Sequence, residues 1–225
     1  MRRELVIALR AMIVTIILVG LIYPLAMTGV AQVIFPGKAN GSLIHRNGAV
    51  VGSALIGQAF EAPITNKKGS AILDKAGCPT FVVAKRYFQT RPSGTGAPYI
   101  DVGGTLDNAA ASAFSNLGPN SETTLGIYEC NITAYLSLER PYDPSLTVSK
   151  VPVDAINSSA SGIDPDISVA NALIQAHRVA ALRHLSLATV DALVSHYTTA
   201  RSLGFIGEPG VNVLELNLAL DRTRS

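Results

Sequence analysis

Residues 11–35 read AMIVTIILVGLIYPLAMTGVAQVIF, a run without a single charged side chain. A helix needs about 20 apolar residues to cross the hydrocarbon core of a bilayer, so this stretch predicts one transmembrane helix. The ten residues before it carry three arginines, Arg2, Arg3 and Arg10. By the positive-inside rule, residues 1–10 are predicted to be cytoplasmic and residues 36–225 to form an extracytoplasmic globular domain.

Pro24 lies inside the predicted span. Proline removes one backbone hydrogen bond and kinks a helix, and in a membrane the freed carbonyl needs another partner. Gly20 and Thr28 lie one turn to either side of Pro24. This pattern indicates that Gly20, Pro24 and Thr28 pack against another helix as well as against lipid.

A cleaved signal peptide is the alternative interpretation of the same stretch. Gly29 and Ala31 are small residues that would suit a cleavage before Gln32. The apolar run is longer than the roughly 7–15 residues of a signal-peptide core, and it continues beyond Gln32. A retained anchor is therefore the favoured interpretation.

Charge outside the first ten residues is balanced. The chain has a net charge of +2, and residues 11–225 carry 15 basic and 15 acidic residues without a basic block. Nucleic-acid binding needs a clustered positive surface, so we expect no nucleic-acid partner. The hydrophobic share of 48% is that of a membrane-anchored globular protein rather than a disordered one.

The remainder predicts an α+β fold class, with one transmembrane helix followed by a single mixed α/β extracytoplasmic domain. Residues 36–60 predict one or two short strands, and residues 61–83 a loop insertion. Helices are predicted over residues 105–117, from Pro165 to about His184, and from Ser186 onward. Residues 211–221 fit both the alternating pattern of a strand and the spacing of a helix, with helix favoured. Residues 125–151 show no clear hydrophobic period.

Side chains for familiar chemistry are sparse. There is no phosphate-binding loop, no dinucleotide fingerprint and no nucleophile elbow, despite the serines at 158, 159 and 161. His177 and His184 have no acid or cysteine at ligand spacing, so a metal site is not expected. Cys78 and Cys130 are either two unpaired buried residues or, outside the cytoplasm, one disulfide.

Five motifs resemble the KdpC family, the C subunit of the bacterial Kdp high-affinity potassium-transporting P-type ATPase. They follow the family's order along the chain: IGQAF at 56–60, YFxxRPS at 87–93, SNLGP at 115–119, VPVDAINSSASGIDPDIS at 151–168 and GEPGVNVLELNLALD at 207–221. Two places depart from the family pattern. Residues 61–83 are longer than the usual link, and Ala113-Phe114 stands where the family usually has glycines.

The resemblance implies a non-catalytic accessory subunit that is needed for assembly and activity of an ATP-driven potassium uptake complex in the inner membrane. The implied partners are a potassium-translocating A subunit, a P-type ATPase B subunit that carries the catalysis, and a small F subunit. The alternative is a nucleotide-binding regulatory subunit that raises the pump's affinity for ATP. In that case the resemblance makes Gln175 the ATP contact, although the predicted topology places Gln175 away from cytoplasmic ATP.

Potassium, the transported ion, suggests one further hypothesis. Asp154, Asp164 and Asp166 lie within one short segment and would provide a local acidic surface for capturing cations. The alternative is structural, with Asp164 and Asp166 capping the next helix and Asp154 ending a strand.

Overall fold

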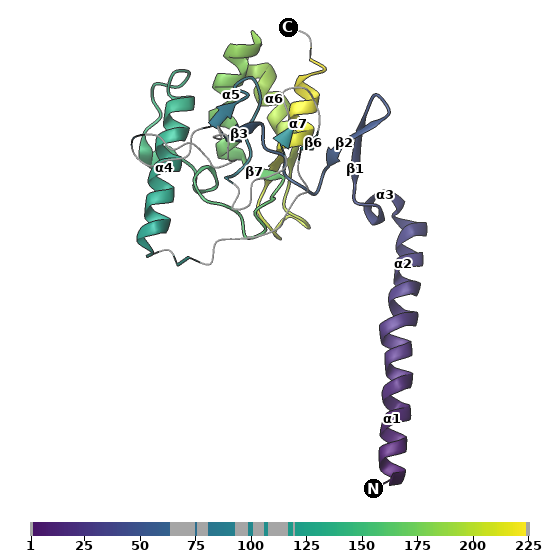
Figure 1. Cartoon of the computed structure of the whole chain (residues 1–225). Helices are drawn as coiled ribbons and strands as arrows, with labels where there is room; N and C mark the ends of the chain where they lie inside the picture. The colour runs from purple at the N-terminus through teal and green to yellow at the C-terminus, as the bar shows by residue number, and fades with distance from the viewer. Residues whose placement is uncertain are drawn as a thin grey trace. The chain divides into compact units, whose positions relative to one another are not determined.

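A computed structural model describes residues 2–63, 75, 81–92, 99–100, 106–107, 117–118 and 120–223 (Figure 1). The chain divides into two compact units, residues 1–53 (unit 1) and residues 54–225 (unit 2). Residues 36–53, which the sequence places in the globular domain, therefore group with the helix that precedes them.

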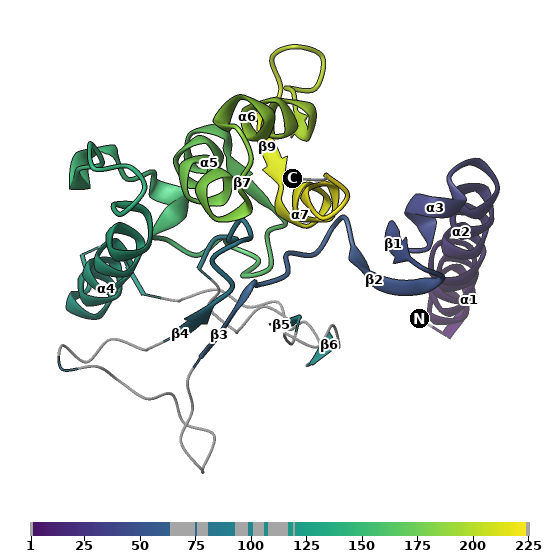
Figure 2. The same cartoon turned by 90° about the horizontal axis from the view of Figure 1, so that it is seen from above.

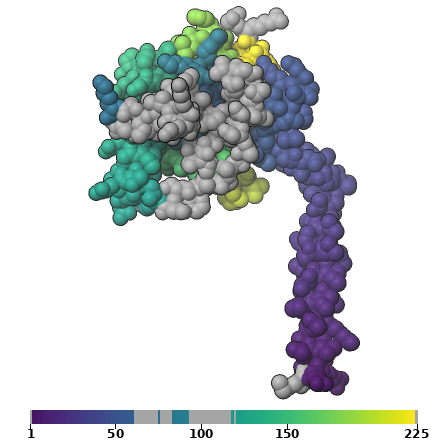
Figure 3. All heavy atoms as spheres, viewed as in Figure 1, coloured from purple at the N-terminus to yellow at the C-terminus, as the bar shows by residue number. Residues whose placement is uncertain are grey.

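Unit 1 begins with a continuous helical segment, drawn in purple in Figure 3. It consists of α1 (Arg2–Ile17), the π-helix η1 (Leu18–Ile22) and α2 (Tyr23–Ile34). Together they form one candidate membrane span of 33 residues, and none of the side chains in α1, η1 or α2 is buried within the chain. The predicted single N-terminal helix is confirmed.

Pro24 is the second residue after the π-helical turn. The Tyr23 N–H bonds to the Leu18 carbonyl, five residues back, so the helix is widened where a proline ring would otherwise crowd the preceding turn. The Thr28 hydroxyl donates to the carbonyl of Pro24 itself at 2.8 Å. The Thr28 hydroxyl therefore bonds within its own turn of the helix.

A β-hairpin completes unit 1. After α3 (Pro36–Ala39), β1 (Leu43–Arg46) pairs antiparallel with β2 (Ala49–Ser53). Asn47 and Gly48 connect them with φ values of 52° and 81°, the left-handed pair that a two-residue hairpin turn requires. The predicted short strands in residues 36–60 are confirmed.

Unit 2 is built on a three-stranded antiparallel sheet of order β7-β9-β8, from β7 (Asp166–Ser168), β8 (Thr198–Thr199) and β9 (Gly210–Asn212). Figure 2 shows α5 (Val169–Arg183), α6 (Leu187–His196) and α7 (Val213–Leu220) grouped around this sheet. The buried apolar residues of unit 2 include Phe88, Ile167, Ala176, Val179, Val190, Val194, Val211, Val213, Leu214, Leu216 and Leu220.

The helix predicted from Pro165 begins later than expected. Asp166 to Ser168 form β7, and α5 begins at Val169 because the Ser168 hydroxyl accepts from the Asn171 N–H at 3.1 Å. Neither Asp164 nor Asp166 is the cap, which corrects the structural hypothesis for these residues. The prediction that Ser186 begins the next helix is confirmed, since its hydroxyl accepts from the Thr189 N–H at 3.0 Å.

The middle of the chain departs most from the sequence-based expectation. Residues without a clear period form α4 (Glu122–Glu139), followed by the short 3-10 helices η2 (Val148–Lys150) and η3 (Val153–Ala155). Within the predicted helix 105–117, β6 (Leu106–Asp107) pairs instead with β5 (Tyr99–Ile100), while residues 105 and 108–116 lie outside the described residues.

The predicted insertion begins and ends in paired strands. β3 (Glu61–Pro63) is antiparallel to β4 (Phe81–Val83), and between them only residue 75 is among those described. The C-terminal run divides into β9 followed by α7. The strand pattern therefore holds at the start of residues 211–221, and the helix pattern holds in the rest.

Candidate functional site

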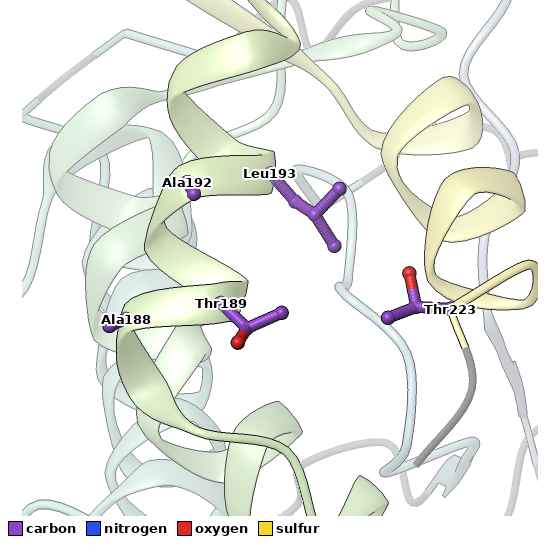
Figure 4. A pocket seen from close by; sticks show the side chains of 5 residues that line it. All are labelled: Ala188, Thr189, Ala192, Leu193 and Thr223. Carbon is purple, nitrogen blue, oxygen red and sulfur yellow. The ribbon is translucent and has the colours of Figure 1, made fainter.

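One surface pocket of about 510 Å³ lies on unit 2 (Figure 4). Leu193 and Thr189 of α6 face Thr223, which follows α7, across this pocket. None of its lining residues is ionisable, so it offers neither an acid–base pair nor a charged ligand contact. These residues are Ala188, Thr189, Ala192, Leu193 and Thr223.

The polar chemistry of unit 2 lies instead in its interior. We call this cluster the polar junction: the side chains of Glu139 on α4, Gln175 and Arg178 on α5, and Asn217 on α7, together with the backbone of residues 85–89. All four side chains belong to residues that are at most 1% exposed. Buried polar groups are costly unless they are hydrogen-bonded, so the partners of each determine what the junction can do.

The Asn217 side-chain amide binds both the backbone N–H and the backbone carbonyl of Phe88. Its Oδ1 accepts from the Phe88 N–H at 2.9 Å, and its Nδ2 donates to the Phe88 carbonyl at 2.9 Å. Residues 85–89 are not part of a helix or strand. The side-chain amide therefore supplies the two hydrogen bonds that a neighbouring strand would otherwise provide.

Gln175 does the same for the next residue. Its Oε1 accepts from the Gln89 N–H at 2.6 Å and from Arg178 Nη2 at 3.0 Å. Its Nε2 donates to the Gln89 carbonyl at 3.1 Å and to Asn171 Oδ1 at 3.0 Å. A glutamine amide has two donor hydrogens and two acceptor lone pairs, and all four are used inside the protein.

Arg178 joins the other members of the junction. Its Nε donates to both carboxylate oxygens of Glu139 at 3.0 Å, and its Nη1 donates to the carbonyls of Lys85 and, at 2.9 Å, Tyr87. Burial raises the pKa of Glu139 to about 7, and the Arg178 guanidinium opposes that rise. The Glu139–Arg178 ion pair, with the bonds from Arg178 to Lys85 and Tyr87, thus connects α4, α5 and the segment 85–89.

A second arginine of α5 holds the same segment nearer the surface. Arg183 donates from Nε to the Arg86 carbonyl at 2.8 Å and from Nη2 to Asp221 Oδ1 at 2.9 Å. Its guanidinium carbon lies 4.6 Å from the centre of the Tyr87 ring, which also stacks on Phe60 at 5.2 Å. Desolvation first, and then the Asp221 charge, raise the pKa of Tyr87.

Asp154 lies in η3 and does not end a strand, contrary to the expectation. Its Oδ2 accepts from the Ser168 N–H at 2.8 Å and from Asn171 Nδ2 at 3.0 Å, and its Oδ1 accepts from the Ser168 hydroxyl at 2.8 Å. The carboxylate thereby holds the residue that caps α5. Its hydrogen bonds go to the protein's own backbone and side chains.

Asp164 lies just before β7, and Asp166 is the first residue of that strand. Asp164 Oδ2 accepts from Arg91 Nη1 at 3.1 Å, and its Oδ1 accepts from the Asp166 N–H at 3.1 Å. The glycine at position 57 of the IGQAF motif is required here, because a Cβ at this position would lie 2.4 Å from the Asp164 carbonyl oxygen. Burial first, and then the Asp164 charge, raise the pKa of Asp166.

The other predicted residues belong to other segments of the chain. Gly20, Pro24 and Thr28 are in the candidate span. Cys130 is on α4 and is disulfide-bonded, whereas Cys78 lies outside the described residues. No group of three or more histidine, cysteine or acidic side chains suited to a metal occurs in the described part of the chain.

The sequence contained a usable sign of the junction. Arg178 interrupts the apolar face of a helix in ANALIQAHRVAALR, and Asn217 interrupts VLELNLAL. Polar residues at helix positions where the hydrophobic period predicts buried side chains indicate an internal hydrogen-bond network. Glu139 gave no such sign, because the helix that carries it was not predicted.

Comparisons with known proteins give one consistent result. The family model for the K+-transporting ATPase c chain, KdpC, matches residues 5–222. The "Potassium-transporting ATPase KdpC subunit" of Mycobacterium tuberculosis (strain H37Rv) is 44% identical over 223 residues, covering 99% of this chain and 100% of that protein. The subunit of Methylococcus capsulatus is 43% identical over 217 residues, with 96% of each chain covered. That of Streptomyces avermitilis is 41% identical over 213 residues, covering 94% of this chain and 90% of the relative.

Proposed function

The chain belongs to the KdpC family of K+-transporting ATPase c chains, and on that premise we propose that it is a non-catalytic accessory subunit that assembles and stabilises the pump. The relatives are named as subunits of a potassium-transporting ATPase. The proposed partners are a potassium-translocating A subunit, a P-type ATPase B subunit that forms the catalytic centre, and a small F subunit. Potassium is the ion that the complex transports.

One observation carries the proposal: the family's most specific motifs serve the fold of this chain. Phe88 and Arg91 of YFxxRPS, Asp154 and Asp164 of the 151–168 motif, and Asn217 of the C-terminal motif all bond to other parts of unit 2. A site that binds a substrate needs donors or acceptors left over. These residues build a rigid body, which suits a subunit whose work is contact with partners.

The candidate span supplies the second contact. Its large side chains, such as Leu18, Leu21 and Met27, are about half exposed within the chain, so lipid or partner helices must cover them. We propose that the face with Gly20, Pro24 and Thr28 packs on a helix of another subunit, since small residues allow close approach and an interrupted helix needs outside support.

The proposed location is the inner membrane, with the N-terminus in the cytoplasm and unit 2 outside. Arg2, Arg3 and Arg10 support this orientation through the positive-inside rule. The test is protease added to spheroplasts that carry the intact complex. Digestion of unit 2 without lysis supports the proposed topology, and protection of unit 2 until lysis contradicts it.

The nucleotide-regulator alternative does not fit the geometry of Gln175. The side chain is 1% exposed, and its four hydrogen-bonding positions are occupied by Gln89, Arg178 and Asn171. An ATP contact would require breaking bonds that hold the segment 85–89. We therefore assign Gln175 a structural role and derive no step through ATP.

Replacing Gln175 by Ala, with Asn217→Ala as the matched control, separates the two functions. Each change leaves one buried backbone N–H and one C=O without partners, so each should lower the free energy of unfolding by about 2–4 kcal/mol. For an accessory subunit, both variants should reduce the yield of assembled pump alike, and the assembled pump should keep its KM for ATP. A KM that rises with Gln175→Ala but not with Asn217→Ala would instead favour the nucleotide regulator.

A further inference from the structure

A surface pocket of unit 1 lies directly after the candidate span. Its volume is about 320 Å³, and it is formed by α3 and β1, which Figure 1 shows beyond the end of α2. We call it the exit pocket. All of its lining residues belong to the same compact unit as the span. They are Pro36, Gly37, Asn40, Leu43 and His45.

Side-chain hydrogen bonds connect the exit pocket to the last turn of α2. Gln32 Nε2 donates to Asn40 Oδ1 at 3.3 Å, and Asn40 Nδ2 donates to Gln32 Oε1 at 3.1 Å. Asn40 Nδ2 also donates to the Pro36 carbonyl at 2.7 Å, and the Ser42 N–H donates to the Gly37 carbonyl at 2.9 Å. The place of the pocket relative to the end of the span therefore follows from contacts within unit 1.

The length of the span sets the depth of the pocket in a bilayer. Residues 11–31 carry neither a charged nor an amide side chain, and they lie between Arg10 and Gln32. At about 1.5 Å per residue, a helix of this length covers roughly 30 Å, the thickness of the hydrocarbon core. Gln32 therefore lies where the core ends and a headgroup layer of about 5–7 Å begins. The first pocket residue follows four positions later, so lipid headgroups are its expected surroundings.

The charge of this region suits an anion. Residues 5–60 contain no acidic residue, while Lys38, next to the lining residue Gly37, and His45 are exposed. In the described part of the chain, neither of these two side chains has an ion pair or a hydrogen bond. An ammonium group and an imidazole N–H are donors that suit phosphate oxygens. A zwitterionic headgroup would bring an ammonium of its own, for which residues 5–60 offer no acid.

We propose that the exit pocket binds the headgroup of one anionic phospholipid, in the leaflet where the span ends at Gln32, and that Lys38 and His45 donate to its phosphate oxygens. The inference rests on the membrane location proposed above and does not depend on the accessory role. Lipid is favoured over a partner protein because the pocket adjoins a span that the chain leaves uncovered, at the depth where headgroups occur.

The first experiment places a photo-crosslinker in the pocket. Leu43, which is 48% exposed, is replaced by p-benzoyl-phenylalanine in the full chain, which is purified from membranes with any pump subunit that accompanies it. The protein is reconstituted into vesicles of phosphatidylcholine with phosphatidylglycerol as the minor component and the same acyl chains in both. After irradiation, mass spectrometry identifies the adducts. A matched probe replaces Leu25, which is 63% exposed on α2 within the predicted hydrocarbon core.

The two probes should report different lipids. Adducts from position 43 should contain phosphatidylglycerol in roughly five-fold excess over its share of the vesicle. This is the ratio that about 1 kcal/mol for one lysine gives at about 1.4 kcal/mol per decade. Adducts from position 25 should reflect the vesicle composition. The proposal is overturned if position 43 shows no excess, reacts with a protein, or gives no adduct while position 25 reacts with lipid.

The second experiment removes the proposed phosphate contact. Lys38→Gln, added to the position-43 probe, should lower the excess about five-fold, to the share in the vesicle. Thermal unfolding should be unchanged, because the Lys38 side chain has no partner in the described structure. Lys150→Gln removes the same charge from an exposed side chain of unit 2 and should leave the excess as it is. Equal losses from both variants would assign the selection to net charge and overturn a pocket.

Glycerol phosphate, the headgroup chemistry without acyl chains, separates a lipid site from a site for free phosphate esters. Added at the concentration of the phosphatidylglycerol, it should leave the adduct at position 43 unchanged. Displacement of the lipid by this compound would contradict the proposal.

These outcomes also separate the inference from the proposed location. If position 25 gives no lipid adduct, the span does not lie in the bilayer and the proposed location is wrong. If position 25 reacts with lipid and position 43 shows no excess, the location stands and the exit pocket is not a headgroup site.

Discussion

The candidate span and the polar junction differ in how far the chain itself buries their side chains. Along Arg2–Ile34 no side chain in the helix is buried by the chain itself. In the junction, Glu139, Gln175, Arg178 and Asn217 are at most 1% exposed, and each is hydrogen-bonded within unit 2. The span therefore depends on an environment outside the chain, whereas the junction depends on nothing else. The motifs that resemble the family therefore belong to the part of the chain that is held by its own contacts, and not to the span.

Removing the span is the strongest way to test this contrast. Deleting residues 1–35 should abolish membrane attachment and release the chain from the pump completely, because the deletion removes the whole candidate span, whose side chains are not buried by the rest of the chain. Co-purification with tagged pump subunits and potassium uptake would be measured. Recovery of an intact, active complex with the truncated chain would mean that the span contributes no essential contact.

Breaking the junction should instead damage folding. Arg178→Ala leaves the Glu139 carboxylate buried without its cation and removes the donors to Lys85 and Tyr87, so the free energy of unfolding should fall by about 3–5 kcal/mol. Denaturant unfolding of the purified chain measures it. Arg201→Ala breaks an exposed ion pair and serves as the control, with an expected loss of about 1 kcal/mol or less. Similar losses from both would show that burial of the Arg178 pair adds nothing.

Sequence alone predicted the parts of the molecule that follow from local pattern. The uncharged run of residues 11–35 predicted the span, and the serine at 186 predicted the start of α6. Sequence-based prediction failed where contacts between distant parts of the chain determine the secondary structure. Asp166 to Ser168 became a strand because β9, more than forty residues later, pairs with them, and α4 was missed because its apolar residues follow no sharp helical period.

The candidate site was predicted only in fragments. Gln175 was singled out by resemblance, but its partner Gln89 lies 86 residues away, in a segment that no local pattern joins to α5, whereas Arg178 is a neighbour on the same helix. The disulfide remains a partial case. Cys130 is disulfide-bonded, and its pairing with Cys78, the chain's one other cysteine, remains a prediction that thiol titration of the unfolded, unreduced protein would test.

The pH dependence of stability sharpens the contrast, because the junction contributes to it through Glu139. Burial raises the pKa of Glu139 from 4.5 to about 7, so between these values the folded protein holds more protons than the unfolded chain. The stabilising contribution is then complete below about pH 4.5 and is lost as pH rises through about 7. Denaturant unfolding across that range should show this decline in the natural chain. Glu139→Gln, which stays neutral, should lack that part of the slope, and an identical slope in both proteins would assign it to other groups.

The smallest effect is expected at Asp166, where the potassium-capture hypothesis can be tested with little disturbance. Asp154 and Asp164 are poor choices for this test, because each carboxylate accepts hydrogen bonds that an asparagine would reproduce only in part. Asp166 is half-buried in β7, and burial and the Asp164 charge both raise its pKa above 3.8. Its charged form is therefore less favourable in the folded protein than in the unfolded chain.

Asp166→Asn should accordingly stabilise the chain at neutral pH by less than about 1 kcal/mol, since solvent screens a group that is this exposed. The gain should vanish near pH 3, where the aspartate itself is neutral. If the residue is structural, the assembled pump keeps its potassium dependence. If it captures cations, apparent potassium affinity weakens at low salt, and the difference from the natural chain shrinks above about 0.1 M salt, where charges are screened over about 10 Å. Potassium uptake at two ionic strengths decides between them, and an unchanged dependence at low salt would place Asp166 with the residues that serve only the fold.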